Sequence, residues 1–367
     1  MAEPTAAEIA SRITQELAST KFACSTLVPL SGGTANFIFK GILVNPFENG
    51  TVDVVMKHGE GFVAQHPVLK LSTLRCDCLK ALEKLPRATN QLSSVRTPRL
   101  FHVNSDSTTQ AQEYLPNSLD LKTYALRYFS CLTPESEKSS VLEIGRVLGK
   151  WLRSFHDWAA SPKQEVLRSR VKLNKEMQGI KLTYNYEKLM WLFEKFPFLK
   201  ESKSVFEDII AKVKAELVDE SQLQIIHGDF WTGNVLLPDA ELKPDRLTSL
   251  FVIDWEMCQL GMRPLDLGQM IAELYELTLY KDIKAGLWII DGFLAGYGSV
   301  DDDFAYRTAL HVGTHLVGFG TSVPGWGTSD QVEMVAKTGM DIILRAWETD
   351  RGWFEAHDLA PLFRRDT

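Results

Sequence analysis

The sequence predicts an α+β protein in two lobes, a β-rich N-terminal lobe followed by a larger, mostly helical C-terminal lobe. The first 114 residues alternate short β-branched and aromatic runs with turn residues, whereas apolar residues beyond Pro116 recur at helical spacing. The length of 367 residues, 45% of them hydrophobic, is enough for two lobes with buried cores. We therefore expect an N-terminal lobe at 1–112, a hinge at 113–118 and a C-terminal lobe at 119–367.

The N-terminal lobe is expected to begin with a helix. Thr5 and Glu8 match a capping box, and Ile9, Ile13 and Leu17 form one apolar stripe behind it. A small antiparallel sheet with one inserted helix should follow, because turn residues such as the NPFENG segment separate the strand-like runs. The predicted elements are strands at 22–30, 37–44 and 52–57, a helix at 68–85, and strands at 98–103 and 110–114.

The C-terminal lobe is expected to be helical with two short strands. The segment 141–158 is amphipathic, with Leu148, Leu152 and Phe155 at helical spacing. Two short apolar runs interrupt the helical pattern and predict strands at 223–226 and 250–253. The other predicted helices lie at 205–217, 265–280, 283–296, 304–318 and 330–347.

The segment QIIHGDFWTGNVLL at 224–237 carries the most chemical information. An apolar strand ends in His227-Gly-Asp229, Asn234 follows five residues later, and a strand resumes at 235–237. A further strand, at 250–253, ends in Asp254. Phosphoryl transfer needs a carboxylate that orients the attacking hydroxyl and oxygen ligands for Mg²⁺. Asp229 can supply the first, and Asn234 with Asp254 the second. One such tripeptide alone could be a strand-to-loop turn with a capping Asp, but the combination predicts a catalytic loop and a metal site.

These motifs resemble the aminoglycoside phosphotransferase and choline kinase family, which includes methylthioribose kinases and fungal small-molecule kinases such as 4-hydroxytryptamine kinase. The family's H-G-D-x-x-x-x-N loop matches 227–234 and its I-D-W/F-E motif matches 253–256. Its P-x-x-D-L-A/G motif resembles 264–268, with one residue fewer between Pro and Asp. The resemblance implies a protein-kinase-like two-lobed fold that uses ATP and Mg²⁺.

The resemblance also implies a role for each motif residue. Asp229 is expected to be the catalytic base, and Asn234 and Asp254 are expected to bind Mg²⁺. Asp266 is expected to brace the catalytic loop. His227 is expected to be a structural hydrogen-bonding residue rather than an acid or base.

A glycine-rich segment in the N-terminal lobe predicts a phosphate site. The segment LSGGTAN at 30–36 lies between two predicted strands and resembles the family's S-G-G-x-x-N loop. Glycines allow backbone N–H groups to approach phosphate, although a Gly-Gly hairpin is also common in β-proteins. The expected nucleotide-binding residues of this loop are Ser31, Gly32, Gly33 and Asn36.

Two further segments resemble nucleotide-binding elements. Lys57 ends a predicted strand and resembles the lysine that pairs with the α/β-phosphates, although a surface lysine is the alternative. Its acidic partner is expected to be Asp77, with Glu83 as the alternative. The segment AQEYLP resembles a hinge whose backbone binds adenine, the alternative being an edge strand ending at Pro. The hinge residues are Glu113, Tyr114 and Leu115.

The acceptor side of the predicted site is acidic. Nine Asp and Glu residues but only three Lys and Arg residues lie between His227 and Glu276, which favours a cationic acceptor. Glu256, Glu273 and Glu276, together with aromatic residues of the final third, could bind an amine through charge and cation–π contacts. The alternative is that Glu273 and Glu276 form a solvated helix face while the aromatic residues fill the core.

The spacing after Asp254 limits the acceptor. Only nine residues separate Asp254 from Pro264, too few for the activation segment of a protein kinase, so the acceptor should be a small molecule. We expect an ATP-dependent phosphotransferase acting on a hydroxyl group of an amine-bearing small molecule. The alternatives are an inactive nucleotide-binding pseudokinase and a kinase of a neutral sugar such as methylthioribose.

Composition limits the partners and the compartment. The formal net charge of −7 disfavours nucleic acid or an anionic membrane as the main partner, and leaves the oligomeric state open. The start MAEPTAAEIA lacks the features of a secretion signal. Five scattered cysteines fit reduced thiols, so we expect a cytoplasmic protein. The cysteines are Cys24, Cys76, Cys78, Cys131 and Cys258.

Overall fold

The chain folds into two compact units. The computed structural model describes residues 4–30, 36–63, 66–70, 80–82, 85, 87–104, 106–243 and 246–365. Unit 1 comprises Met1–Lys84 and Thr97–Pro116, and unit 2 comprises Leu85–Arg96 and Asn117–Thr367. The segment 85–96 was expected in the N-terminal lobe but belongs to unit 2, because strand β7 (Ser93–Arg96) pairs with a strand of that unit.

Unit 1 is built on a five-stranded antiparallel sheet with the strand order β1-β2-β3-β9-β8. Each strand overlaps one predicted from the sequence, and the predicted turn at 45–50 joins β2 to β3, with Gly50 at a φ of +82°. The β-rich character expected of this region is therefore confirmed. The strands are β1 (Cys24–Pro29), β2 (Phe37–Leu43), β3 (Asp53–His58), β8 (Leu100–Asn104) and β9 (Thr109–Glu113).

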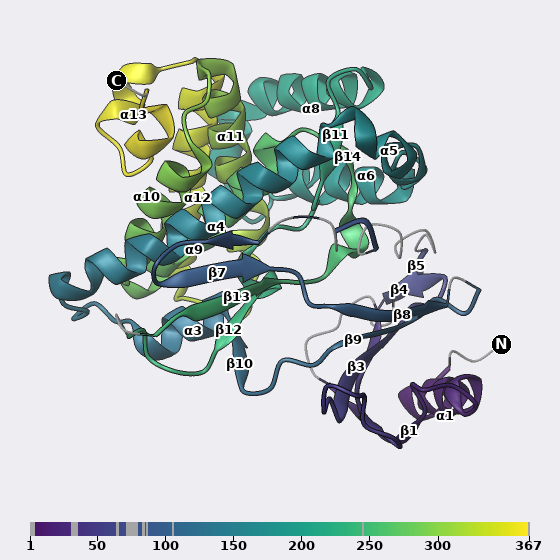
Figure 1. Ribbon diagram of the computed structural model, residues 1–367. Helices are drawn as coiled ribbons and strands as arrows, with labels where there is room; N and C mark the ends of the chain where they lie inside the picture. The colour runs from purple at the N-terminus through teal and green to yellow at the C-terminus, as the bar shows by residue number, and fades with distance from the viewer. Residues whose placement is uncertain are drawn as a thin grey trace. The chain divides into compact units, whose positions relative to one another are not determined.

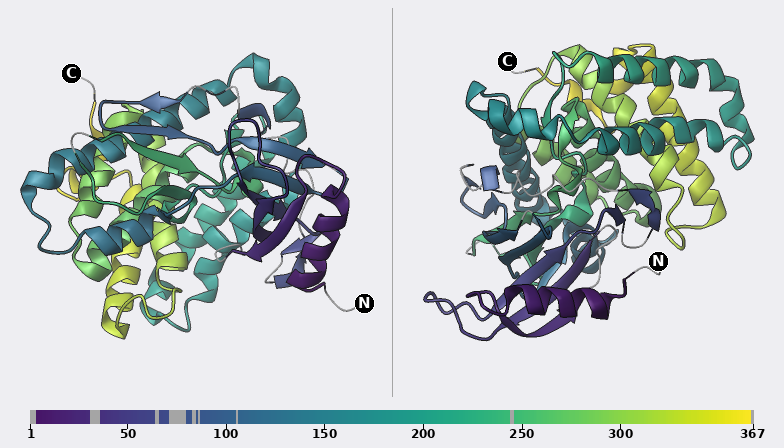
Figure 2. Two further views of the ribbon diagram at one scale, coloured as in Figure 1. Left: turned by 60° about the horizontal axis from the view of Figure 1, so that its bottom comes forward. Right: turned by 90° about the vertical axis from the view of Figure 1, so that its right-hand side faces the viewer.

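Helix α1 (Ala6–Leu17) packs on this sheet, as both views in Figure 2 show. The predicted capping box is confirmed, since the Thr5 hydroxyl accepts from the Glu8 backbone and the Glu8 carboxylate accepts from the Thr5 backbone. The predicted apolar stripe of α1 is buried in one cluster with inward-facing residues of β2 and β3. Each of its three aliphatic side chains contributes about 1.5–3 kcal/mol by burial.

The helix predicted at 68–85 is wrong at its start. Residues His66–Lys70 form strand β5, which pairs antiparallel with β4 (Phe62–Val63). A short apolar run does not distinguish strand from helix by periodicity alone, and Pro67 followed by β-branched Val68 favours an extended backbone. Residues 80–82 are helical, while the part between, with Asp77, lies outside the described residues.

Unit 2 contains a five-stranded sheet in the order β10-β12-β13-β7-β6 and a separate pair, β11 with β14. The predicted strands at 223–226 and 250–253 correspond to β11 and β13. The strand expected at 235–237 corresponds to β12. The other strands of this unit have two to four residues each, too few for a clear alternation of apolar and polar residues. Their bounds are β6 (Ala88–Thr89), β10 (Ser118–Asp120), β11 (Gln224–Ile226), β12 (Val235–Pro238), β13 (Thr248–Val252) and β14 (Gln259–Gly261).

The rest of unit 2 is mostly helical, and every helix predicted for the C-terminal lobe is present (Figure 1). In the described part of the chain, no helix is both long and apolar enough to cross a membrane. The helices are α3 (Leu121–Tyr128), α4 (Lys138–Ala159), α5 (Glu165–Val171), α6 (Lys175–Leu182), α7 (Lys188–Trp191), α8 (Lys203–Val218), α9 (Pro264–Lys281), α10 (Ala285–Tyr297), α11 (Asp302–His315), α12 (Ser329–Trp347) and α13 (Arg351–Glu355).

Helices α4 and α10 cross in direct backbone contact. Gly145 and Gly149 of α4 face Gly292 and Gly296 of α10, and a Cβ at any of these positions would collide with a carbonyl oxygen of the opposite helix. Small residues are therefore required at this crossing. The close approach fixes α4, whose last turn carries His156 into contact with Asp266 of α9.

Candidate catalytic site

The candidate catalytic loop, residues 227–234, follows β11 and leads through the short turn Thr232–Asn234 into β12. Gly228 lies at its sharpest point, with a φ of +79°. An added Cβ would collide with the carbonyl oxygen of Met257, so both the backbone angle and the available space require glycine. The loop conformation is thus encoded in the middle residue of the HGD motif.

Asp266, in the first turn of α9, holds the start of this loop. Its carboxylate is 1% exposed and accepts hydrogen bonds from the backbone N–H groups of His227 and Gly228, both at 2.9 Å. It also accepts from His156 Nε2 at 3.1 Å, while His156 Nδ1 contacts the Tyr297 hydroxyl at 2.9 Å. Burial lowers the pKa of His156, so a neutral ring bonds the carboxylate. One buried carboxylate thereby joins the loop to α9 and α4.

His227 links the catalytic loop to the second motif. Its Nδ1 accepts from the backbone N–H of Asp229 at 3.2 Å, so Nε2 carries the proton and donates to the Ile253 carbonyl oxygen at 2.9 Å. Burial lowers the pKa of His227 and keeps the ring neutral. The Ile253 N–H donates to the Asn234 carbonyl oxygen at 3.0 Å. Both backbone groups of Ile253 are therefore tied to the loop, which places Asp254 next to it.

Asp229 is held by four hydrogen bonds from three side chains. Asn234 Nδ2 donates to the backbone carbonyl oxygen of Asp229 at 2.9 Å and to Asp229 Oδ2 at 3.1 Å. Lys181 Nζ and Gln269 Nε2 both donate to Oδ1, at 2.9 and 2.8 Å. Burial by itself would raise the pKa of Asp229, but Lys181 and Gln269 outweigh it and lower the pKa below its usual value. The carboxylate is therefore ionised at neutral pH, with 28% of the side chain exposed.

Lys181 and Gln269 were missed by the sequence analysis. Lys181 lies on α6, a helix that was not predicted, and 48 residues separate it from Asp229. Gln269 lies on the predicted helix 265–280, three residues after Asp266, and this spacing places both side chains on one helix face. That spacing was the one sequence signal for Gln269, and none existed for Lys181.

Asn234 and Asp254 present oxygen atoms from the ends of neighbouring segments. The amide nitrogen of Asn234 donates to Asp229, and this orientation directs the amide oxygen of Asn234 away from Asp229. Asp254 follows β13 with a φ of +63°, a left-handed conformation uncommon for a residue other than glycine. An amide oxygen and a carboxylate are ligands that suit Mg²⁺, so the donor set fits this metal.

Glu273 and Glu276 of α9 are buried, with 6% and 1% exposure, so the interpretation as a solvated helix face is wrong. Lys122 of α3 places its Nζ 2.9 Å from Glu273 Oε2 and 3.5 Å from Glu276 Oε2. The same ammonium lies 4.4 Å from the centre of the Trp326 ring, whose Nε1 donates to Glu276 Oε2 at 3.0 Å. The side chains of Glu273, Glu276 and Trp326 thus bind the ammonium group of Lys122, a residue of the protein itself.

The charges in this cluster are unequal. Burial and the neighbouring charge of Glu273 raise the pKa of Glu276 to about 8, so Glu276 is mostly protonated at neutral pH. Burial would also raise the pKa of Glu273, but His315 and Lys122 lower it below its usual value. Ligand atoms of Glu273, Glu276 and His315 lie within 4.8 Å of one another. The Lys122 ammonium already supplies the cation that these groups would otherwise attract.

Glu256 is also buried, within the turn Trp255–Met257 that follows Asp254. In unit 1, Lys57 of β3 lies opposite Gln110 of the adjacent strand β9. Asn36 is buried and directly precedes β2. Glu113 ends β9 and accepts from the Arg99 backbone at 3.0 Å, with Tyr114 and Leu115 directly after it. The remaining predicted nucleotide residues, Ser31, Gly32, Gly33 and the two alternative partners Asp77 and Glu83, lie outside the described residues.

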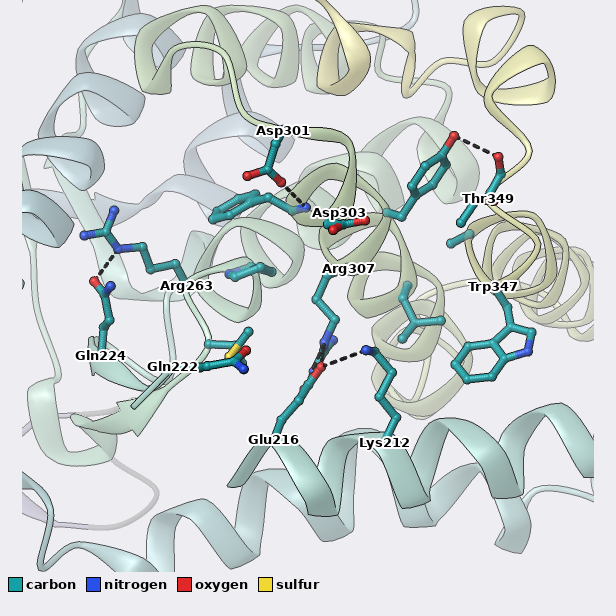
Figure 3. Close-up of a pocket in the computed structure, with 16 residues that line it drawn as sticks. Lys212, Glu216, Gln222, Gln224, Arg263, Asp301, Asp303, Arg307, Trp347 and Thr349 are labelled. Atoms are coloured by element: carbon teal, nitrogen blue, oxygen red, sulfur yellow. Dashed lines mark hydrogen bonds and ion pairs between the residues drawn. The ribbon is translucent and has the colours of Figure 1, made fainter. Parts of the chain in front are cut away.

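A cavity of about 620 Å³ in unit 2 is lined by side chains of α8 and α11 and by the segment that leads into α9 (Figure 3). Arg307 and Glu216 point toward each other across it and are joined by a bidentate ion pair, and Lys212 lies beside them. Among the described residues that line it, Asp229, Asn234 and Asp254 do not appear. The cavity is therefore separate from the catalytic loop.

Comparisons with known proteins agree with this geometry. Residues 47–307 match the model of the phosphotransferase enzyme family. The chain is 27% identical to phosphotransferase FrzJ of Cladobotryum sp over 97% of both chains. It is 30% identical to the 4-hydroxytryptamine kinase of Psilocybe cyanescens over 39% of this chain and 40% of that one.

Among solved structures, a choline/ethanolamine kinase family protein from Mesorhizobium loti aligns with a TM-score of 0.48 at 12% identity, covering 92% of this chain and 98% of that one. The family match covers well over half of the chain, and it includes the whole loop 227–234, strand β13 that leads to Asp254, and the start of α9. The chain therefore belongs to the phosphotransferase enzyme family and is a small-molecule kinase.

Proposed function

We propose that this kinase transfers the γ-phosphoryl group of ATP to a hydroxyl group of a small molecule, with Asp229 as the catalytic base. The observation that carries the proposal is an ionised, partly exposed carboxylate whose Oδ1 is taken by two donors while Oδ2 has one. In the reaction, the acceptor hydroxyl gives its proton to Asp229 Oδ2. The acceptor oxygen bonds to the γ-phosphorus, and the bridging oxygen keeps the electron pair as ADP leaves.

Asn234 and Asp254 are proposed to hold Mg²⁺ at this site. Support comes first from the hydrogen bonds of Ile253, which fix the two residues next to each other. In addition, Asn234 contacts Asp229 through its amide nitrogen, so the amide oxygen takes no part in that contact. When bound, Mg²⁺ neutralises charge on the phosphate oxygens. His227 and Asp266 are proposed to act structurally, since their contacts hold the loop backbone.

Unit 1 is proposed to bind the nucleotide. The glycine-rich segment 31–33 and Asn36 would contact the phosphates, Lys57 would pair with them, and the backbone at 113–115 would bind adenine. Support for Lys57 and for 113–115 comes from the family match, which covers 47–307, and from the place of Lys57 inside a continuous antiparallel sheet. The glycine-rich segment and Asn36 precede the matched residues, and their role rests on the resemblance of the SGGTAN sequence alone. Either Asp77 or Glu83 would be the acidic partner of Lys57.

The acceptor is proposed to carry an amine as well as the hydroxyl group. Support comes from the similarity to 4-hydroxytryptamine kinases and from the excess of acidic residues around the catalytic loop. Because Lys122 lies between Glu273 and Glu276, an acceptor ammonium would contact these carboxylates only by taking the place of the lysine ammonium. Glu256 is the third carboxylate to test.

An ADP-release assay over matched compounds tests these proposals. The panel pairs each hydroxy-amine with its N-acetylated analogue and adds neutral sugars and aminoglycosides. Turnover of an amine with loss of activity on N-acetylation would support the amine class. A neutral sugar used better than every amine would exclude that class and leave the kinase assignment in place.

Two variants test the residue roles. Asp229→Asn should abolish turnover while nucleotide affinity stays within about twofold, because a base orients the acceptor and contributes little to nucleotide binding. Asp254→Ala should remove the Mg²⁺ dependence of nucleotide affinity in calorimetric titrations. Asp208→Asn, on the exposed face of α8, is the matched control and should behave as wild type. Unchanged turnover in Asp229→Asn would show that another group is the base.

A further inference from the structure

A lysine from outside both catalytic motifs contacts the proposed base. Lys181 Nζ lies 2.9 Å from Asp229 Oδ1 and 3.0 Å from Gln269 Oε1, and Gln269 Nε2 lies 2.8 Å from the same Asp229 oxygen. The three side chains therefore form a closed ring of hydrogen bonds between α6, α9 and the catalytic loop. We propose that Lys181, supported by Gln269, is a positioning residue that presents Oδ2 of Asp229 to the acceptor hydroxyl. This inference rests on the proposed function.

The distribution of donors explains the orientation. Each carboxylate oxygen can accept about two hydrogen bonds, and Oδ1 of Asp229 receives two within this ring. Oδ2 receives one, from Asn234. Rotation of the carboxylate would break two hydrogen bonds at once, one of them to an ammonium group. Oδ2 is thereby fixed as the oxygen that can still accept a hydrogen bond, from the acceptor hydroxyl.

The burial of the two partners differs in a way that suits this role. The Lys181 side chain is 10% exposed, whereas that of Asp229 is 28% exposed. The ammonium therefore lies on the protected side of the carboxylate and leaves the accessible side to a ligand. Two of the three donors of Lys181 are used by Asp229 and Gln269, which offsets much of the cost of burying its charge.

A contribution to folding alone would not explain this pair well. Replacement of a buried ion pair by apolar side chains of similar size is often neutral or stabilising, so such a pair is weak evidence for stability. Methionine has nearly the length of lysine without its charge, and Lys181 lines a small pocket together with apolar residues such as Val213 and Leu265. Removal of the lysine alone is costly where it leaves a buried carboxylate uncompensated, but Asp229 is 28% exposed and keeps Asn234 and Gln269 as donors. A Lys181→Met variant should for this reason fold and lose the orientation of Asp229.

The first experiment compares steady-state kinetics with the acceptor found in the ADP-release assay. Lys181→Met should lower kcat by about a hundredfold, the effect of a small misplacement of a catalytic group, with the KM for ATP within about twofold. Lys181→Arg should retain more activity because it restores a cation. Lys175→Met, on the same helix but 51% exposed and paired with Glu220, is the matched control and should match wild type.

Chemical rescue separates positioning from a structural role. Lys181→Ala removes the side chain, and added ethylammonium should raise its kcat by about tenfold relative to wild type in the same buffer. Lys181→Met should show no such gain, because its side chain fills the space. A purely structural lysine would give no rescue, and that result would overturn the proposal even if Lys181→Met failed to fold.

The outcomes distinguish this inference from the proposed function. Wild-type turnover that is lost in Asp229→Asn establishes the function, and a Lys181→Met kcat within about threefold of wild type then overturns the positioning role alone. A KM for ATP that rises in proportion to the loss of kcat also overturns it, since the lysine would then serve nucleotide binding. Absence of any wild-type turnover overturns both.

Discussion

Removal of the Asp266 carboxylate should strongly destabilise unit 2. In Asp266→Ala, the backbone N–H groups of His227 and Gly228 and the ring of His156 lose their common acceptor. All three donors are buried, with His227 and His156 at 0% exposure, so water does not readily replace the carboxylate. An unsatisfied buried donor costs about 1–3 kcal/mol, which gives a loss of at least about 3 kcal/mol in the free energy of unfolding.

Urea unfolding followed by tryptophan fluorescence measures this loss. All nine tryptophans lie between Trp151 and Trp353, hence in unit 2, so the signal reports this unit. Asp266→Asn keeps one oxygen and should lose about 1–3 kcal/mol, because at least one donor then faces an NH₂ group. Asp208→Ala, on the exposed face of α8, should stay within about 0.5 kcal/mol of wild type.

The comparison among these variants decides the argument. An Asp266→Ala loss below about 1 kcal/mol, in the range of ordinary surface substitutions, would refute the proposed cost of the three unsatisfied donors. A large loss for Asp266→Ala with none for Asp266→Asn would show that a single oxygen satisfies the loop and that the negative charge is unnecessary.

Three further predictions concern neighbouring residues. Gly228→Ala should cost about 1–2 kcal/mol through its φ of +79° and more through collision with Met257, so a wild-type urea midpoint would contradict the argument. Glu276 has a pKa of about 8 folded against a usual 4.5. Between these values the folded state alone keeps the proton, so stability falls by up to about 1.4 kcal/mol per pH unit as pH rises. Glu276→Gln should remove this slope in unfolding experiments from pH 5 to 8. Lys122→Met should cost less than the roughly 3–5 kcal/mol of a fully unpaired buried charge, because Glu273 keeps its contact with His315, and adding Glu273→Gln should recover part of the loss in a double-mutant cycle.

The sequence by itself determined the elements whose signals are local. The capping box at Thr5, the antiparallel strands of unit 1 and the long helices of unit 2 follow from residue spacing within one element. The pattern from His227 to Asn234 indicated a loop between two strands for the same reason, since the loop and its flanking strands are contiguous. Strands of two to four residues, such as β6 and β14, carried too little periodicity to be recognised.

The tertiary structure alone decided which distant side chains meet at the site. Lys181 contacts Asp229 across 48 residues, His156 contacts Asp266 across 110, and Lys122 contacts Glu273 across 151. No local pattern encodes such pairs, because each depends on how whole helices pack, as in the glycine-lined crossing of α4 and α10 that fixes the helix bearing His156. The acidic side chains of α9 illustrate the consequence. Their composition suggested an open site for an amine, whereas the packing of α3 brings the protein's own ammonium group between them.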